Sequence, residues 1–377
     1  MAIDPDVRVL LDGINNRIDS FDGSLPGAVG DGIADDTAAF QSAVDGLSNG
    51  DLWRIPKGQY RITASIDFGS RRGLRIKGLG GQSANDGGYA GASIIVEGAG
   101  GFSFNDGGPL IHEGPIVEYV NFVDNTLQGA VLVRVENMNY WTFRNCTFRV
   151  KDPSSFANGG VGLRLVQTSG NDNAWGMIDQ CRFIGMDVGL DSQGSVGFTM
   201  VGGNFIAHTG QVGTRLDHRT QNTKFFGVKF DGPGGGINID GGLFNQVCGC
   251  SFEGCSIGVD INDNNDGHFR GNQNAIIGGF FYGCTTGISL GSGIWGTTIL
   301  APTFNSTTTA IDNYSEDALF LGTGNEMLGA RLGTNWADGT RAAASSMNPG
   351  TMIYNTDDNA PNWSDGTNWR DAAGSVT

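Results

Sequence analysis

Acidic residues recur at regular spacing in the middle of the sequence. Asp217 and Asp240 are 23 residues apart, and Asp231 and Glu253 are 22 residues apart. Two carboxyl groups held about 5 Å apart can cleave a glycosidic bond with retention of configuration, and a separation of about 6.5 to 9.5 Å allows inversion. These residue types therefore indicate glycoside hydrolysis. We predict Asp217 and Asp240 as the acid and base pair, with Glu253 as the substitute for either.

Cationic and titratable side chains accompany these acids. The run LDHRTQN places His218 and Arg219 directly after Asp217, so that an imidazole and a guanidinium share one loop with a carboxyl group. A guanidinium makes directed hydrogen bonds to oxygen acceptors, and an imidazole titrates near neutral pH. The residues that we predict to bind substrate are Arg215, His218, Arg219, Asp231 and Asp260.

Two other interpretations of these residues stay open. A chain with a net charge of −16 must expose many acids. The regularly spaced acids could therefore be solvated surface residues without a role in catalysis. A polysaccharide lyase would need a base and a cation that neutralises a uronate carboxylate. Candidates for those two groups are His218, Arg219, His268 and Arg270. Because the neighbouring acids would repel a polyuronate, hydrolysis of a neutral or weakly charged glycan is favoured.

A repeat built on phenylalanine must position these side chains. Eight short runs, from EYVNF to LAPTF, end in a phenylalanine, with spacings of 22 to 35 residues. The eight are Phe122, Phe148, Phe183, Phe205, Phe230, Phe252, Phe281 and Phe304. An apolar residue stands five positions before each, and a glycine with an aliphatic residue commonly stands after it. Cys146, Cys181 and Cys250 share the position two before the phenylalanine, which favours a packing role for these cysteines.

This period predicts a β-solenoid, in which short strands joined by Gly and Asn turns form coils that pack on their neighbours. Leucine-rich repeats have similar periods, but their leucine consensus and helix are missing, and propeller blades need about 40 to 45 residues. In this register, adjacent coils bring Asp217 beside Asp240 and Asp231 beside Glu253. The longer spacings predict lateral loops at 151–160 and 262–274.

An amphipathic capping helix is predicted at about 36–47. Phe40, Val44 and Leu47 lie on one helical face, and such a helix covers the open apolar end of a solenoid. The surrounding sequence GDGIADDTAAFQSAV, followed by IPKGQYRIT, resembles the N-terminal motif of the pectate-lyase-like β-helix superfamily, particularly its bacteriophage tailspikes. The resemblance covers residues 28–80 and implies an all-β, right-handed parallel β-helix that assembles as a homotrimer.

Three segments are expected along the chain. Residues 1–27 carry a short heptad pattern, which predicts an oligomerisation segment as a three-stranded coiled coil, or a helix packed on its own solenoid. Residues 28–315 are predicted to form the parallel β-helix. Residues 316–377 contain MIYN and SDGTNW, which predict a small β module similar to terminal modules of phage tail proteins.

Charge and composition narrow the classes of partner. The net charge of −16 disfavours nucleic acid and anionic membranes, and no run of 18 apolar residues predicts membrane insertion. The cysteines lack zinc spacing. The run NDNNDG at Asn262–Gly267 resembles the first half of a calcium loop, but its twelfth position is Gln273. We therefore predict neither a metal ion nor a cofactor.

The resemblance implies a protein of the virion tail that acts at a bacterial cell surface. Tailspikes similar to this chain commonly cleave surface polysaccharide, so the leading hypothesis is binding and endo-hydrolysis of capsule, exopolysaccharide or lipopolysaccharide. The alternatives are a receptor spike that binds glycan without cutting it, a structural tail subunit, and a polysaccharide lyase. The expected partners are the polysaccharide, further copies of the chain and, for a structural subunit, another tail protein.

Overall fold

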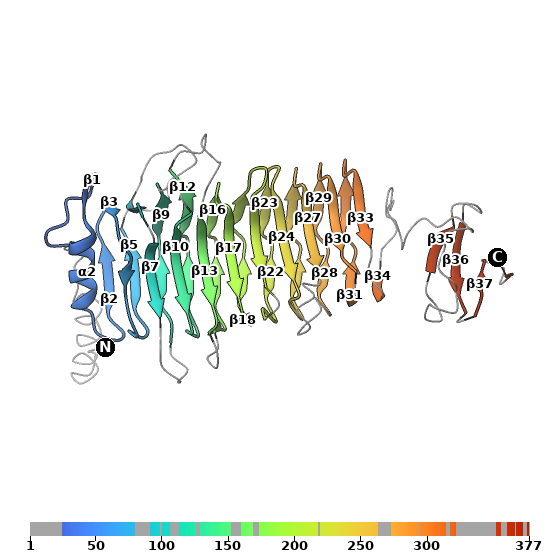
Figure 1. Cartoon of the computed structure of the whole chain (residues 1–377), viewed down its shortest axis with the longest axis horizontal. Coiled ribbons are helices and arrows are strands. Elements are labelled where there is room, and N and C mark those ends of the chain that lie inside the picture. Colours follow the sequence, from blue (N-terminus) through green and yellow to red (C-terminus); the bar gives the residue numbers. More distant parts are fainter. Residues whose placement is uncertain are drawn as a thin grey trace, which may run out of the picture.

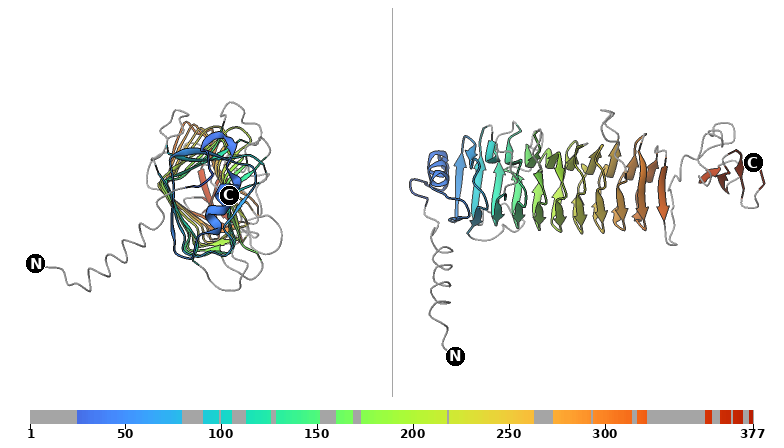
Figure 2. Two further views of the ribbon diagram at one scale, coloured as in Figure 1. Left: turned by 90° about the vertical axis from the view of Figure 1, so that its left-hand side faces the viewer. Right: turned by 90° about the horizontal axis from the view of Figure 1, so that it is seen from below.

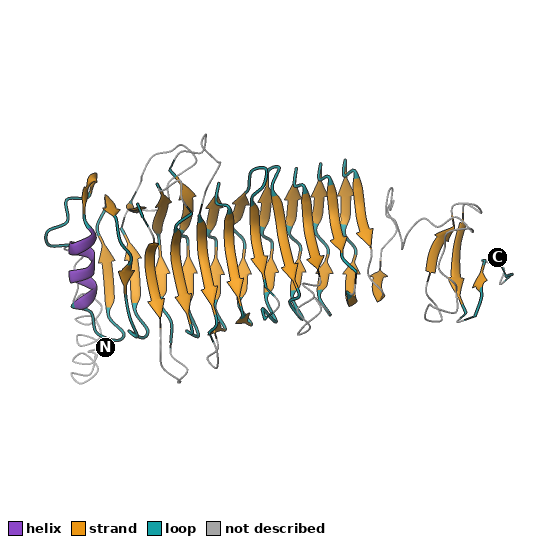
Figure 3. Cartoon of the chain, viewed as in Figure 1, coloured by secondary structure: helices purple, strands orange, loops and turns teal. Residues whose placement is uncertain are grey.

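The computed structural model describes residues 25–79, 91–98, 100–105, 113–125, 129–151, 160–168, 173–217, 219–262, 273–292, 294–313, 317–321, 352–355, 360–365, 367–371 and 375–376. Over most of these residues the chain winds into a stack of coils, and successive coils add short strands to three parallel sheets (Figures 1 and 3). The architecture is a right-handed, single-stranded parallel β-helix, as the repeat and the resemblance predicted.

The three sheets, called A, B and C, run along the solenoid, and a regular coil passes through them in the order B, A, C. Sheet A contains β1 (Asp31–Asp35), β3 (Gly58–Ile62), β6 (Ala92–Val96), β9 (Val120–Asp124), β12 (Thr147–Val150), β16 (Arg182–Ile184), β20 (Asn204–Ile206), β23 (Lys229–Asp231), β26 (Ser251–Glu253), β29 (Phe280–Tyr282) and β32 (Thr303–Asn305). Sheet B contains β2 (Leu52–Ile55), β5 (Arg75–Gly78), β8 (Ile116–Glu118), β11 (Thr142–Arg144), β15 (Met177–Asp179), β19 (Thr199–Val201), β22 (Lys224–Phe226), β25 (Gln246–Cys248), β28 (Ala275–Ile277), β31 (Trp295–Leu300) and β34 (Asp317–Leu321). Sheet C contains β4 (Ile66–Asp67), β7 (Gly100–Asn105), β10 (Val131–Glu136), β13 (Val161–Val166), β17 (Val188–Gln193), β21 (Val212–Leu216), β24 (Gly235–Asp240), β27 (Ile257–Asn262), β30 (Thr286–Leu290) and β33 (Thr309–Asn313).

The eight phenylalanines of the repeat form one interior column. In-register pairing in sheet A places each of them opposite the next, from Phe122 to Phe304. Neighbouring ring centroids lie 4.5 to 5.3 Å apart, close to the spacing of paired strands. The apolar residues five positions earlier form a second column in sheet B. The predicted repeat register is therefore confirmed.

A column of glycines in sheet C makes room for these rings. A Cβ atom at Gly189 would lie 2.7 Å from Cδ1 of Phe205 on the following coil and 2.6 Å from the carbonyl oxygen of Gly213. The same close approach to the next coil recurs at Gly162, Gly189, Gly213, Gly236, Gly258 and Gly287. The glycine that follows six of the eight phenylalanines is therefore explained by the packing of the next coil's ring against it.

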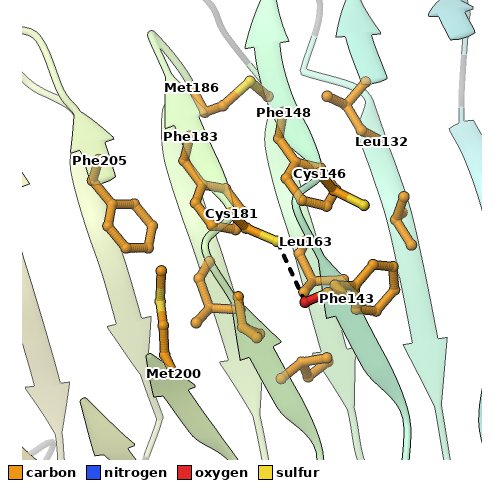
Figure 4. Close-up of a cluster of buried hydrophobic side chains, with 14 of the residues drawn as sticks. Leu132, Phe143, Cys146, Phe148, Leu163, Cys181, Phe183, Met186, Met200 and Phe205 are labelled. Atoms are coloured by element: carbon orange, nitrogen blue, oxygen red, sulfur yellow. Dashed lines mark hydrogen bonds between the residues drawn. The ribbon is translucent and has the colours of Figure 1, made fainter. Parts of the chain in front are cut away.

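All six cysteines are free thiols, and five of them are buried inside the solenoid; Cys248 is partly exposed. The Sγ atom of Cys181 donates a hydrogen bond of 3.5 Å to the carbonyl oxygen of Phe143 on the preceding coil, between the rings that line the core (Figure 4). Cys146 and Cys250 make the same type of contact with the preceding coil. Their shared position in the repeat thus gives them a shared structural environment at a turn.

The helix α2 (Thr37–Asp45) lies at the N-terminal end of the stack (Figures 1 and 2). Phe40 on its inner face is fully buried, and its ring centroid lies 5.5 Å from that of Trp53 and 5.2 Å from that of Tyr60. Asp36 precedes the helix, and its carboxylate accepts backbone N–H hydrogen bonds from the segment ahead of it. Asp36 therefore holds the segment at Val29 and Gly30 against the start of the helix.

Several predictions concern residues at the two ends. Most of the predicted segment 1–27 lies outside the described residues. Strand β34 pairs with β31 and carries sheet B past the predicted solenoid boundary at residue 315. Within 316–377, β35 (Met352–Asn355), β36 (Ala360–Ser364) and β37 (Trp369–Arg370) form an antiparallel sheet. No helix among the described residues is long and apolar enough to cross a membrane.

Candidate functional site

An outward-facing column on sheet C carries alternating charges. In-register pairing brings Arg164 opposite Asp191, Asp191 opposite Arg215, and Arg215 opposite Asn238. The column continues to Asp260, which is opposite Asn238 on the next strand. Because the side chains at these positions point away from the core, consecutive coils place them next to one another at about 4.8 Å intervals. Arg215 and Asp260, both predicted to bind substrate, therefore share one outward column.

Asp191 is the buried centre of this column. Its side chain is only 1% exposed, and its two oxygens each accept a hydrogen bond of 2.9 Å, Oδ2 from Nε of Arg164 and Oδ1 from Nε of Arg215. The hydrogen bond to Asp191 raises the pKa of Arg215 above its ordinary value, and the negative charges of Asp240 and Asp217 raise it further. Arg215 is thus fixed as a cation beside the two predicted catalytic acids.

Asp217 and Asp240 lie two positions further along the same strands. Leu216 is opposite Ile239, so the following residues, Asp217 and Asp240, occupy adjacent coils. The Oδ1 atom of Asp217 accepts hydrogen bonds from the backbone N–H of Arg219 at 3.1 Å and from the Thr220 hydroxyl at 3.3 Å. Pairing continues from Asp240 to Asn262 on the next coil. The register therefore places Asp217 and Asp240 on adjacent coils at the end of sheet C.

The loop after β21 places a second cationic side chain, Arg219, beside Asp217. Nη2 of Arg219 lies 3.6 Å from Oδ2 of Asp217, and Nη1 donates to the carbonyl oxygen of Gln167 at 3.5 Å. Arg219 thereby spans from its own coil to the coil of β13. The predicted substrate-binding residue His218 lies outside the described residues, as do His268 and Arg270 of the lyase alternative.

The remaining predicted residues lie on a different sheet. Asp231 and Glu253 are opposite each other on β23 and β26 of sheet A, as the repeat register predicted. Nζ of Lys229 lies 3.2 Å from Oδ2 of Asp231 and 2.9 Å from Oε2 of Glu253. Sheets A and C form separate faces of the solenoid (Figure 2). The predicted residues therefore form two clusters rather than one.

Two exposed aromatic pairs were not found from the sequence. The rings of Tyr140 and Trp175, 54% and 52% exposed, lie 5.5 Å apart with an interplanar angle of 21° at the corner between sheets C and B. Phe280 and Tyr282 lie 6.2 Å apart with an angle of 11° on the outer face of sheet A. The alternation of β29, in which Phe281 alone points inward, was the available signal for the second pair.

The clusters combine three kinds of side chain. Paired carboxylates, guanidinium donors and exposed aromatic rings can contact hydroxyl groups and the C–H faces of sugar rings. Among the described residues, no group of three or more His, Cys, Asp and Glu side chains is arranged to hold a metal ion.

Solved structures that are similar to this chain share little sequence identity with it. No family model and no curated protein matches the chain. It is similar to the solved structure of ORF18 from Geobacillus virus E2, with 15% identity, a TM-score of 0.45, and coverage of 100% of this chain and 89% of that chain. It is also similar to DFA-IIIase from Arthrobacter chlorophenolicus A6 in complex with GF2, with 12% identity, a TM-score of 0.49, and coverage of 79% and 92%.

A third similar structure is the phiAB6 tailspike in complex with oligosaccharides of Acinetobacter baumannii surface polysaccharide, with 14% identity, a TM-score of 0.44, and coverage of 100% of this chain and 60% of that chain. The register of its own three sheets identifies the chain as a right-handed, single-stranded parallel β-helix protein.

Proposed function

We propose that this chain binds and depolymerises a bacterial surface polysaccharide by endo-glycosidic hydrolysis at the outer face of sheet C. The observation that carries the proposal is the placement of Asp217 and Asp240 on adjacent coils beside Arg215, which Asp191 holds in position. Paired strands lie about 4.8 Å apart, which matches the carboxyl separation of about 5 Å in retaining glycosidases. We therefore expect retention of anomeric configuration.

We assign the two acids different roles. Asp217 accepts hydrogen bonds from Arg219 and Thr220, which orient its carboxylate, and we assign it as the nucleophile. Asp240 is assigned as the acid that protonates the leaving oxygen and later activates water. Arg215 and Arg219 bind hydroxyl or carbonyl oxygens of the substrate, and Asp260 binds at the next coil. His218 is kept as a substrate-binding proposal from the sequence.

The test compares wild-type protein with Asp217→Asn and Asp240→Asn on polysaccharide extracts from a panel of bacterial hosts. We expect new reducing ends from the wild type without absorbance near 235 nm, and a loss of about 100-fold or more in each variant. Asp312→Asn is the matched control, because Asp312 belongs to the outward charged column of sheet C but lies at its far end.

Two outcomes would overturn this mechanism. Reducing ends accompanied by absorbance near 235 nm would show a lyase. Binding of a surface glycan without any cleavage would show a receptor spike that holds the polymer and does not cut it, which is the principal alternative. A chain that binds no surface glycan at all would be a structural tail subunit, with another tail protein as its partner.

The assembly proposal is a homotrimer in a phage tail. The outer face of sheet B supports self-association, because its pairing aligns a column of apolar side chains that are at least partly exposed. The column consists of Val201, Phe226, Cys248, Ile277 and Leu300. Exposed apolar columns of this kind commonly mark protein–protein contacts. Sheets A and C then keep their outer faces for polysaccharide.

A further inference from the structure

The outer face of sheet A carries a compact polar and aromatic cluster on three consecutive coils. Register places Lys229, Ser251 and Phe280 in one outward column, and Asp231, Glu253 and Tyr282 in the next. The turns that follow β23, β26 and β29 are short. We call these six residues the sheet A cluster. Because sheet A is a different face from sheet C, this cluster is separate from Asp217 and Asp240.

Lys229 organises the two carboxylates of the cluster. Its Nζ atom contacts Asp231 at 3.2 Å and Glu253 at 2.9 Å, so one cation bridges two coils. The hydrogen bond from Lys229 holds the pKa of Glu253 below its ordinary value of 4.5, and the Ser251 hydroxyl contributes in the same direction. Glu253 therefore stays ionised at neutral pH. An ionised carboxylate accepts hydrogen bonds but has no proton to give to a leaving group.

The two aromatic residues of the cluster lie next to each other on the following coil. Phe280 is 38% exposed and Tyr282 is 49% exposed, and their rings are nearly parallel at 11°. The core does not require them, because Phe281 between them fills the interior column. Two large aromatic side chains held side by side in solvent lose apolar burial, which a ligand with an apolar face would restore.

Sugar rings combine the two features that this cluster offers to a ligand. Their axial C–H groups form an apolar face that packs on an aromatic ring, and their equatorial hydroxyls donate hydrogen bonds to carboxylates. The cluster holds two negative charges and one positive charge, so it favours an uncharged polymer over a polyuronate. An extended polymer that crosses from Tyr282 to Glu253 and Asp231 would contact the aromatic rings on one coil and the carboxylates on the two preceding coils.

We propose that the sheet A cluster is a second, non-catalytic saccharide-binding site that takes a neutral segment of surface polysaccharide. The inference rests on the proposed function in one respect, which is that both sites bind the same polysaccharide. It assigns Glu253 and Asp231 to holding the polymer rather than to cleaving it. A site away from the cleavage site would keep the protein attached to the cell surface after each cut, because release at one site leaves the other bound.

The test measures binding in the Asp217→Asn background, so that polymer is not degraded. Surface polysaccharide from a panel of hosts is separated by anion exchange into neutral and acidic fractions, and each fraction is cast into native gels to measure retardation. We expect Tyr282→Ala to weaken binding to a neutral fraction about tenfold, and Tyr282→Phe to restore most of it. Phe244→Ala is the control, because Phe244 is exposed to a similar extent, 42%, at a corner turn.

Three results would overturn the inference: no neutral fraction retards the starting protein, Tyr282→Ala binds as tightly as the control, or Tyr282→Ala changes the oligomeric mass. The third result would make this face a contact between copies of the chain. The outcome is distinguishable from failure of the proposed function, which is read from cleavage. Weakened binding in Tyr282→Ala, with cleavage that does not depend on Asp217 or Asp240, would keep the inference and reject the mechanism.

Discussion

The Nε atom of Arg215 donates a hydrogen bond of 2.9 Å to Oδ1 of Asp191, a carboxyl group that is almost completely buried. We predict that Asp191→Asn lowers the free energy of unfolding by about 1.5 to 3 kcal/mol, because hydrogen bonds to charged groups are among the strongest. The variant should also lose polymer cleavage, since Arg215 is no longer fixed beside Asp217. Urea unfolding followed by circular dichroism checks the first effect.

The matched control for this prediction is Asp312→Asn, at the far end of the same outward column. We expect its free energy of unfolding to stay within about 0.5 kcal/mol of wild type, as for most surface substitutions. If Asp191→Asn and Asp312→Asn have the same free energy of unfolding, the hydrogen bond between Asp191 and Arg215 does not hold Arg215 in position.

The phenylalanine column should dominate stability. Phe205 is buried, and its ring stacks at 4.5 Å on Phe183 and at 4.8 Å on Phe230. We predict that Phe205→Ala costs about 3 to 5 kcal/mol, because it removes a buried ring and leaves a cavity between two coils. Phe244→Ala removes an equal ring from an exposed corner turn and should cost far less. Equal midpoints for the two variants in urea would contradict the column as the main source of stability.

The corner pair should bind glycan. Tyr140 and Trp175 adopt positive φ angles of 56° and 51°, where bulky residues are uncommon. We predict that Trp175→Ala weakens polysaccharide binding several-fold while the unfolding midpoint changes little. Gel retardation in neutral polysaccharide measures the binding. Phe244→Ala, which removes an exposed ring with a φ of 56°, is the comparison, and equal retardation of the two variants would reject the prediction.

Binding at the sheet A cluster should persist in mild acid. Lys229 keeps the pKa of Glu253 below 4.5, so the carboxylate stays ionised as pH falls to that value and is protonated only at lower pH. In Lys229→Met the pKa of Glu253 should rise, so binding should fall at a higher pH than in wild type. The measurement is retardation in a neutral polysaccharide gel between pH 3.5 and 7. Identical pH profiles would show that Glu253 does not contact the polymer.

The apolar column of sheet B provides the test of assembly. We predict that Phe226→Asp reduces the oligomeric mass measured by light scattering, because a charge would be buried against another copy. Phe244→Asp introduces the same charge at another exposed aromatic residue and should leave the mass unchanged. A wild-type protein that is monomeric at high concentration would reject the trimer outright.

The sequence was sufficient to predict the coils and their register. The interior columns can be predicted from the sequence, because each coil repeats the residue type of the previous coil at the same position. Asp217 beside Asp240, and Asp231 beside Glu253, follow directly from that register. The fold class and these neighbour relations were therefore available from the phenylalanine spacing alone.

The grouping of the site was not predictable in the same way. The repeat register tells which residues share a column, but not which face that column occupies, because the angle between sheets is set by turn backbones such as that of Gly232 with a φ of 106°. Tyr140 and Trp175 each stand eight residues before a phenylalanine of the repeat, Phe148 and Phe183, so the register does place them on adjacent coils. The exposure and stacking of their rings depend on the positive φ angles of this corner turn and were not apparent from the sequence.

The fit of six phenylalanine rings, from Phe183 to Phe304, against glycines of the preceding coils also bears on how such a chain can change its length. A ring such as that of Phe205 and the glycine it contacts, Gly189, belong to different coils, so neither residue can be replaced independently of the other. A duplicated or deleted stretch of one full period brings or removes one member of each pair and leaves a matched junction. A stretch of any other length keeps these pairs matched only where it lengthens or shortens a turn or a lateral loop, as in the spacings of 22 to 35 residues. Heritable variation in this solenoid should therefore come in whole coils or in the loops between strands.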